Sequence, residues 1–193
     1  CSNGSVSFIP ETTLREDLAD YDPNELPTAN TEAKALSEIR INSNSSTFCK
    51  KFKFDYGYFL SEESALPGAL FGLFGQAAQN NVPNYDFFDT KKLKLNSVQE
   101  LSCDDNTSVP PHRFTYYEPD KLSRVISFSQ DHWGFNNGVK TNIGLVPELE
   151  TMNGFEANRE AAWPAMSAGT LAVIEYPTGG SSEFIYEPNS VIT

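Results

Sequence analysis

The stretch TFCKKFKFDYGYF, residues 47–59, decides the fold class because its side chains alternate with a period of two. Successive side chains of an extended chain point to opposite faces, so this pattern predicts a β-strand. We expect its aromatic face to pack inward and its lysine face to meet solvent or a second layer. The aromatic parity holds Phe48, Phe52, Phe54, Tyr56 and Tyr58, and the other parity holds Cys49, Lys51, Lys53 and Asp55.

Strand signals of the same kind recur on both sides of this stretch. Between the last two stands PTGG, where Pro177 presets φ and Gly179 or Gly180 can adopt a positive φ, so a hairpin is expected. Helical composition is limited to residues 13–19 and to 152–169, which Pro164 interrupts. The chain is therefore predicted to be mainly β, with antiparallel strand-turn-strand units and short helical excursions. The expected strands are 36–41, 92–101, 112–118, 124–129, 170–176 and 182–187.

The composition divides the chain at residue 36. Residues 1–35 are rich in Pro, Asn, Thr and acidic residues, which predicts a linker or a segment that hugs the surface. Residues 36–193 are predicted to form one β-rich unit with an apolar inserted loop at about 61–90. Exposing large apolar side chains costs about 1.5 to 3 kcal/mol each, so this loop either folds over the sheet or docks on a partner. Its candidate partner contacts are Leu70, Phe71, Leu73 and Phe74.

The charge balance argues against nucleic acid as a partner. Fourteen basic residues stand against 26 acidic ones, for a net charge of −12, whereas phosphate binding needs a positive surface. No apolar run reaches the roughly 20 residues that span a bilayer. Cys1 followed by Ser is either the start of a lipid-modified lipoprotein, which would place the chain at a membrane, or the start of an excerpt.

The three cysteines have neither the spacing of a disulfide framework nor that of a zinc site. Cys49 and Cys103 are either buried or spare thiols, or they form one bridge in an exported protein. The acidic run CDDNTS, residues 103–108, lacks the alternating oxygen ligands and the distal glutamate of a calcium loop, so it is interpreted as a solvated turn. We predict no metal and no cofactor.

The stretch SQDHWGFNNG, residues 129–138, is the densest polar and aromatic part of the chain. A hydrolase would use Asp131 with His132, but neighbours on an extended segment point to opposite faces and do not pair simply. The other histidine, His112, follows two prolines at the start of a predicted strand. No catalytic residue is therefore predicted.

The same stretch is interpreted as the anchor of a turn. Asp131 can accept backbone N–H bonds, and Trp133 and Phe135 are expected to bury aromatic surface. Asn136, Asn137 and Gly138 supply the positions that tolerate a left-handed backbone. The predicted structural anchors in this turn and in the PTGG turn are Asp131, His132, Trp133, Gly134, Tyr176, Pro177, Gly179 and Gly180.

Several stretches occur in an order that resembles the region preceding or opening the repeats of large RHS (YD-repeat) proteins, especially the surface or secreted kind found in Bacteroidetes. The resemblance covers roughly residues 36–190, and the apolar loop looks like an insertion. The stretches are FKFDYGYF, KKLKLNSVQE, HRFTYYEPDKL, SQDHWGFNNG, LVPE, ANREA, AGTLAVIEYPTGG and SEFIYEPN.

The resemblance implies a curled, solenoid-like β-sheet that forms part of a shell. Such a shell encloses cargo or displays an interaction surface at the cell surface. The implied partners are the remainder of the same long polypeptide and secretion-translocon or cell-surface proteins, with type IX secretion as the implied route. The implied location is secreted or on the exterior of the outer membrane.

Two other functions remain open from the sequence. A carbohydrate- or protein-binding β module would use Trp133, Phe135 and Tyr117 as an exposed stacking platform. It requires those rings to be exposed, so burial of Trp133 would exclude it. A hydrolase using Asp131 and His132 is the weaker alternative.

Overall fold

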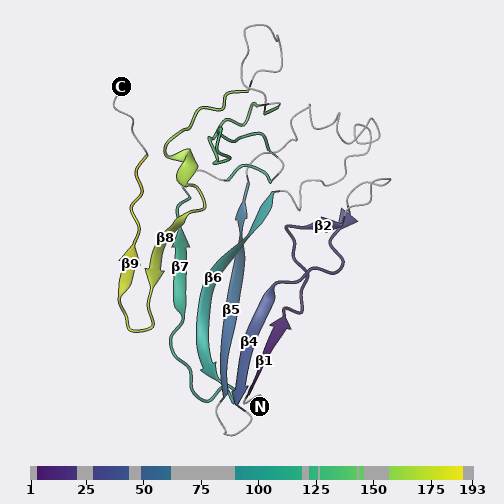
Figure 1. Ribbon diagram of the computed structural model, residues 1–193, viewed down its shortest axis with the longest axis vertical. Helices are drawn as coiled ribbons and strands as arrows, with labels where there is room; N and C mark the ends of the chain where they lie inside the picture. The colour runs from purple at the N-terminus through teal and green to yellow at the C-terminus, as the bar shows by residue number, and fades with distance from the viewer. Residues whose placement is uncertain are drawn as a thin grey trace.

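The computed structural model describes residues 4–20, 28–43, 49–61, 90–118, 122–125, 127–142, 144–145 and 157–188. Seven strands form one antiparallel sheet in the order β1-β4-β5-β6-β7-β8-β9 (Figure 1). The predicted mainly β, antiparallel class is confirmed. The strands of this sheet are β1 (Gly4–Pro10), β4 (Leu36–Ser43), β5 (Cys49–Leu60), β6 (Lys91–Ser102), β7 (His112–Tyr116), β8 (Leu171–Glu175) and β9 (Ser181–Glu183).

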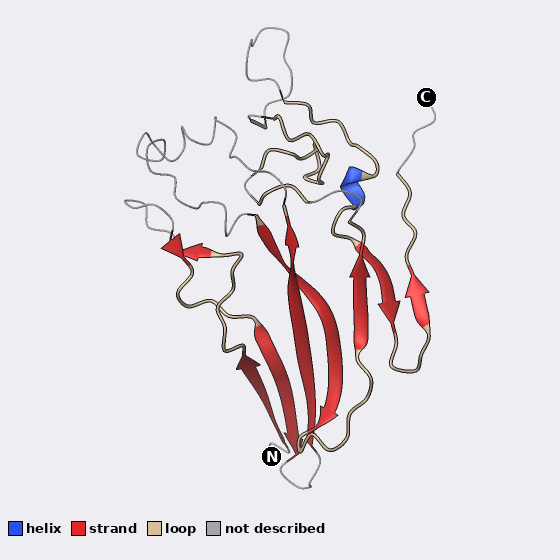
Figure 2. Ribbon diagram, turned by 180° about the vertical axis from the view of Figure 1, so that it is seen from behind, coloured by secondary structure: helices blue, strands red, loops and turns tan. Residues whose placement is uncertain are grey.

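The sheet is an up-and-down meander. From β4 to β9 every strand pairs with the next one in the chain, and β1 adds to the outer edge of β4. The residues between β1 and β4 include a second, two-stranded sheet of β2 (Ala19–Asp20) and β3 (Thr28–Ala29). Strands β1 and β9 are therefore the two edges of the main sheet, as the two opposite views show (Figures 1 and 2).

The stretch 47–59 forms most of β5, as its alternation predicts. The strand pairs with β6 from Lys50↔Ser102 to Leu60↔Lys91, with a bulge at the Asp55/Tyr56 step. Its aromatic side chains are half-buried. On the other face Lys53 and Asp55 are exposed as expected, whereas Lys51 is only 3 % exposed and pairs with Asp105.

The PTGG turn joins β8 and β9 in the expected hairpin. The Tyr176 N–H donates to the Gly180 carbonyl at 2.8 Å, and the Gly179 N–H donates to the Tyr176 carbonyl at 3.0 Å. Gly179 has φ of 87°, a left-handed conformation that side chains rarely adopt. The strand after the turn is shorter than predicted, because β9 ends at Glu183.

Three local predictions are wrong. Residues 124–129 form no strand in their described part, because Arg124 is buried, the Ser129 hydroxyl donates to the Val139 carbonyl and Val125 is exposed. Residues 13–19 form no helix, since the Arg15 N–H donates across to the Ala33 carbonyl. Within 157–169 the helical composition gives only the 3-10 turn η1 (Ala165–Ser167), coloured blue in Figure 2.

The stretch expected to be a linker or a surface segment begins with an edge strand. Strand β1 pairs with β4 from Gly4↔Ser43 onward. The chain then crosses the aromatic face of β5 through residues 11–16. The apolar loop and its four candidate contacts, residues 70, 71, 73 and 74, lie outside the described residues.

Burial is unusual in the described part of the chain. The buried hydrophobic side chains there are Ala157 and Ala165, and the buried polar or charged residues outnumber them. A disulfide joins Cys49 at the start of β5 to Cys103 just after β6, with the two Cα atoms 5.6 Å apart. Within the described residues the main sheet is thus a single layer, ordered by its ladders and this bridge more than by an apolar core.

Candidate functional site

The turn at Asp131 lies in a group of loops above the ends of β5, β6 and β7 (Figure 1). We call this group the loop cap and define it as residues 122–125, 127–142, 144–145 and 157–169. Seven of the ten buried polar or charged residues of the described chain belong to it. They are Ser123, Arg124, Ser129, Asp131, Asn137, Asn142 and Ser167.

Asp131 holds the turn through hydrogen bonds from the backbone. The side chain is fully buried, and its Oδ1 accepts the N–H groups of Trp133 at 2.9 Å and Phe135 at 3.0 Å. Arg159 donates to the Asp131 backbone carbonyl. The second carboxylate oxygen, Oδ2, has no hydrogen-bond partner among the described residues, so half of this buried carboxylate is unsatisfied.

The aromatic side chains of the turn are exposed. This corrects the expectation that Trp133 and Phe135 bury aromatic surface. Trp133 is 76 % exposed and Phe135 is 54 % exposed. His132 is also exposed, with its ring edge-on to that of Trp133 at 6.3 Å between centroids. The physical reason is that backbone bonds to Asp131 fix the turn, so no aromatic packing is needed to close it. Asp131 and His132 share no hydrogen bond in the described structure.

Two asparagines connect the loops of the cap. Asn142 donates to the carbonyls of Phe128 at 3.1 Å and Asn158 at 2.8 Å, and its Oδ1 accepts the Asn158 N–H at 2.9 Å. Asn137 donates to the Asn158 carbonyl at 2.9 Å and accepts the Val139 N–H. The sequence alone does not identify Asn142 as part of this network. The only available signal was an asparagine at the end of a turn-rich stretch.

The second predicted anchor group lies in the β8–β9 hairpin. Tyr176 is 37 % exposed, its hydroxyl donates to Ser182 Oγ at 3.0 Å, and its ring meets His112 edge-on. Gly180, unlike Gly179, has no positive φ. The two anchor groups therefore lie in different elements, one in the cap and one at the opposite end of β8 (Figure 1).

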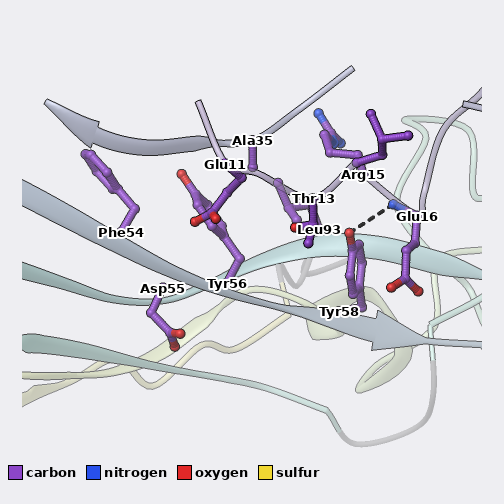
Figure 3. Close-up of a pocket in the computed structure, with 11 residues that line it drawn as sticks. Glu11, Thr13, Arg15, Glu16, Ala35, Phe54, Asp55, Tyr56, Tyr58 and Leu93 are labelled. Atoms are coloured by element: carbon purple, nitrogen blue, oxygen red, sulfur yellow. Dashed lines mark hydrogen bonds between the residues drawn. The ribbon is translucent and has the colours of Figure 1, made fainter. Parts of the chain in front are cut away.

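A recess opens where residues 11–16 cross the aromatic face of β5. Its volume is about 280 Å³. Figure 3 shows Phe54, Tyr56 and Tyr58 facing the crossing segment, while the Asp55 carboxylate points to the other side of the strand. We call it the Tyr56 recess. The alternation in the sequence predicts the aromatic face but not this recess, because no local pattern indicates that residues 11–16 return to β5.

The crossing segment is held by paired charges. Arg15 donates to both carboxylate oxygens of Asp17, at 3.0 and 2.7 Å, and Asp17 Oδ2 also accepts the Leu93 N–H at 3.0 Å. Burial opposes ionisation of Asp17, but the Arg15 and Leu93 bonds leave its pKa below the ordinary value. Glu16 pairs with Lys91, and its N–H donates to the Tyr58 hydroxyl at 3.0 Å.

The acidic turn after β6 lies beside the disulfide and carries a second charge cluster. Lys51 Nζ is 2.5 Å from Asp105 Oδ1. The hydrogen bond from Lys51 lowers the pKa of Asp105. Hydrogen bonds from the Ser102 hydroxyl and from Asn106 lower the pKa of Asp104 to about 2.

The described residues contain no group of three or more His, Cys, Asp or Glu side chains arranged to hold a metal ion. In the same part of the chain no helix has the length and apolarity needed to cross a membrane. No family model, curated protein or solved structure matches this sequence.

Proposed function

We propose that this chain is a structural segment of a large exported RHS-type protein, where it builds part of a β-sheet wall. The wall either encloses cargo or displays an interaction surface at the cell surface, and the rest of the same polypeptide is its main partner. The ordered motifs at residues 36–190 support the family, and the curled, shell-like form of the sheet belongs to the proposal.

One observation carries the proposal. Among the described residues the seven-stranded sheet is a single layer whose edge strands, β1 and β9, each pair on one side, and the buried hydrophobic residues are two alanines. Open edges offer unpaired N–H and C=O groups to further strands. A sheet of this kind gains stability when neighbouring protein extends its edges and covers its faces.

The Cys49–Cys103 disulfide supports export. Disulfides persist in oxidising compartments and are rare in the cytosol, where reductants keep thiols free. The net charge of −12 suits a soluble surface and disfavours nucleic acid. Secretion-translocon or cell-surface proteins are the transient partners that this location requires.

Export is tested on intact cells that produce the full-length protein. After blocking free thiols with N-ethylmaleimide, we expect peptide mass spectrometry to recover Cys49 joined to Cys103. External protease should also release peptides of this chain while a cytosolic marker stays intact. Alkylation of Cys49 and Cys103 as free thiols, together with full protection of the chain from external protease, would refute the exported location.

A second function is favoured by the exposure of Trp133 and Phe135. Two large rings stand in solvent on a turn that Asp131 fixes through two backbone hydrogen bonds. Such a preorganised aromatic platform suits a sugar ring or an apolar side chain of a partner protein. Trp133 and Phe135 have the exposure that this function requires, whereas Tyr117 is half-buried and its hydroxyl donates to the Phe184 carbonyl.

The platform is tested by fluorescence in a Trp163→Phe background, which leaves Trp133 as the sole tryptophan. A glycan array is screened first. Titration with a β-1,4-linked glucose hexasaccharide should then shift the fluorescence emission of Trp133 if the platform binds carbohydrate. Trp133→Ala should abolish retention on the responding glycan without changing the urea midpoint. An array without any retained glycan contradicts carbohydrate binding.

A further inference from the structure

The Tyr56 recess combines an aromatic wall with the Glu11 carboxylate, which forms no ion pair with any described residue. Its volume of about 280 Å³ lies near the small end of ligand pockets, which suits one side chain or one small molecule. Phe54 and Tyr56 stack with 6.4 Å between ring centroids, and Tyr58 continues the wall toward residues 11–16 (Figure 3).

Most charges around the recess are already matched. Arg15 is paired with Asp17 through two hydrogen bonds, and Glu16 is paired with Lys91. Arg15 therefore has its Nε and one terminal nitrogen turned to Asp17 and is a poor anchor for an anion.

Three polar side chains of the recess remain available. The Glu11 carboxylate, the Thr13 hydroxyl and the Tyr56 hydroxyl have no hydrogen bond or ion pair with any described residue. Burial and the nearby Glu11 charge both raise the pKa of Tyr56, which agrees with a carboxylate close to that ring. The recess thus offers an acceptor charge beside aromatic faces.

The same aromatic row already accepts one cation. Lys91 Nζ lies 5.7 Å from the centroid of the Tyr58 ring. Ring faces attract ammonium groups through their quadrupole, and a neighbouring carboxylate adds a Coulombic attraction. An anion would be repelled by Glu11, and a neutral ligand would gain no Coulombic attraction from it.

We propose that the Tyr56 recess binds a primary alkylammonium group, with Glu11 as the counter-ion, Tyr56 and Tyr58 as the aromatic wall and Thr13 as an additional acceptor. The group is carried either by a free small amine or by a lysine side chain of a peptide. The site is independent of the proposed role of the sheet in a larger wall.

The test is a titration of the ¹⁵N-labelled 193-residue chain with n-butylammonium chloride, followed through amide shifts of residues in β5 and 11–16. The neutral probe n-butanol and the anionic probe butyrate serve as ligand controls. We expect saturable shifts with n-butylammonium alone. Equal binding of n-butanol would overturn the proposal.

Two matched variants test whether the Glu11 carboxylate is the counter-ion of the bound ammonium group. Glu11→Gln should weaken n-butylammonium binding by about threefold to fivefold, the range expected of a partly exposed ion pair. Glu183→Gln makes the same change at an exposed residue of the opposite edge strand, β9, outside the recess, and should leave the affinity unchanged. Equal loss in both variants, or no loss with Glu11→Gln while its spectrum stays folded, contradicts the assignment.

A third arm identifies the source of the amine. N-acetyl-lysine N-methylamide presents the same ammonium group on a peptide unit. Tighter binding than n-butylammonium assigns the site to a lysine of a peptide, and equal or weaker binding assigns it to a small amine. Failure of both amines to bind refutes the site.

Discussion

The β5–β6 ladder and the loop cap are ordered in different ways. Strands β5 and β6 are twelve residues long each and pair along nearly their whole length. In the described cap the β pairing is the isolated Gln130↔Asn136 bridge, and buried side chains bond to backbone groups instead. The ladder can form from backbone groups alone, whereas the cap depends on particular polar side chains.

This difference predicts where single substitutions matter. In the ladder a side-chain change leaves the backbone pairing in place, so cross-links and charges should dominate its response. In the cap, removal of one buried amide leaves several backbone groups unpaired, and each such group costs free energy.

The largest effect is expected from the disulfide. Cys49 and Cys103 are 54 residues apart, and closing a loop of that length restricts the unfolded chain by about 4 kcal/mol in the chain-entropy account. Cys49→Ser/Cys103→Ser should lower the free energy of unfolding by that order in urea denaturation. Replacing Cys1 by Ser is the control and should change little, and an unchanged midpoint in the double variant would refute the stabilising role.

The next effect is expected in the cap, at Asn142. Asn142→Ala removes three part-buried hydrogen bonds between a buried side chain and the backbone, and should reduce the free energy of unfolding by about 2 to 3 kcal/mol. Asn158→Ala is the matched control. Its exposed side chain makes one local bond to the Glu160 N–H, so about 1 kcal/mol or less is expected. Similar losses in both variants would mean that the cap does not depend on Asn142.

The sequence predicts the ladder better than the cap for the same reason. Period-two alternation in residues 47–59 reports directly which face of β5 each side chain occupies. The PTGG hairpin is equally local, because its glycine chemistry acts within four residues. These features were predicted without knowledge of any distant contact.

The cap and the recess depend on contacts that local patterns do not report. Residues 124–129 look like a strand, yet Ser129 donates its hydroxyl to the Val139 carbonyl at 2.7 Å. Asp131 was identified as an acceptor of backbone N–H groups, but exposure of Trp133 was not, since aromatic residues are usually placed inside. The Tyr56 recess exists because residues 11–16 return to β5, which is a long-range event.

The smallest effect is expected from lowering the pH, and it concerns the acidic turn after β6 that lies beside the disulfide. The folded pKa of Asp104 is about 2, below its ordinary value of 3.8, and the pKa of Asp105 is lowered too. These carboxylates therefore contribute stability above about pH 4, and the contribution is lost as the pH falls toward 2. The urea midpoint should drop over this range, and Asp104→Asn should reduce the drop. An identical pH profile in Asp104→Asn would contradict the role of this turn.

The central claim is that the single-layer sheet is completed by further protein at its open edges. Hydrogen exchange of the amides on the free edges of β1 and β9, measured in this chain and in the longer polypeptide, tests it most directly. The account predicts exchange at least about tenfold slower in the longer polypeptide, with amides in the centre of β5 changing less. Equal exchange at both edges in the two proteins would contradict it.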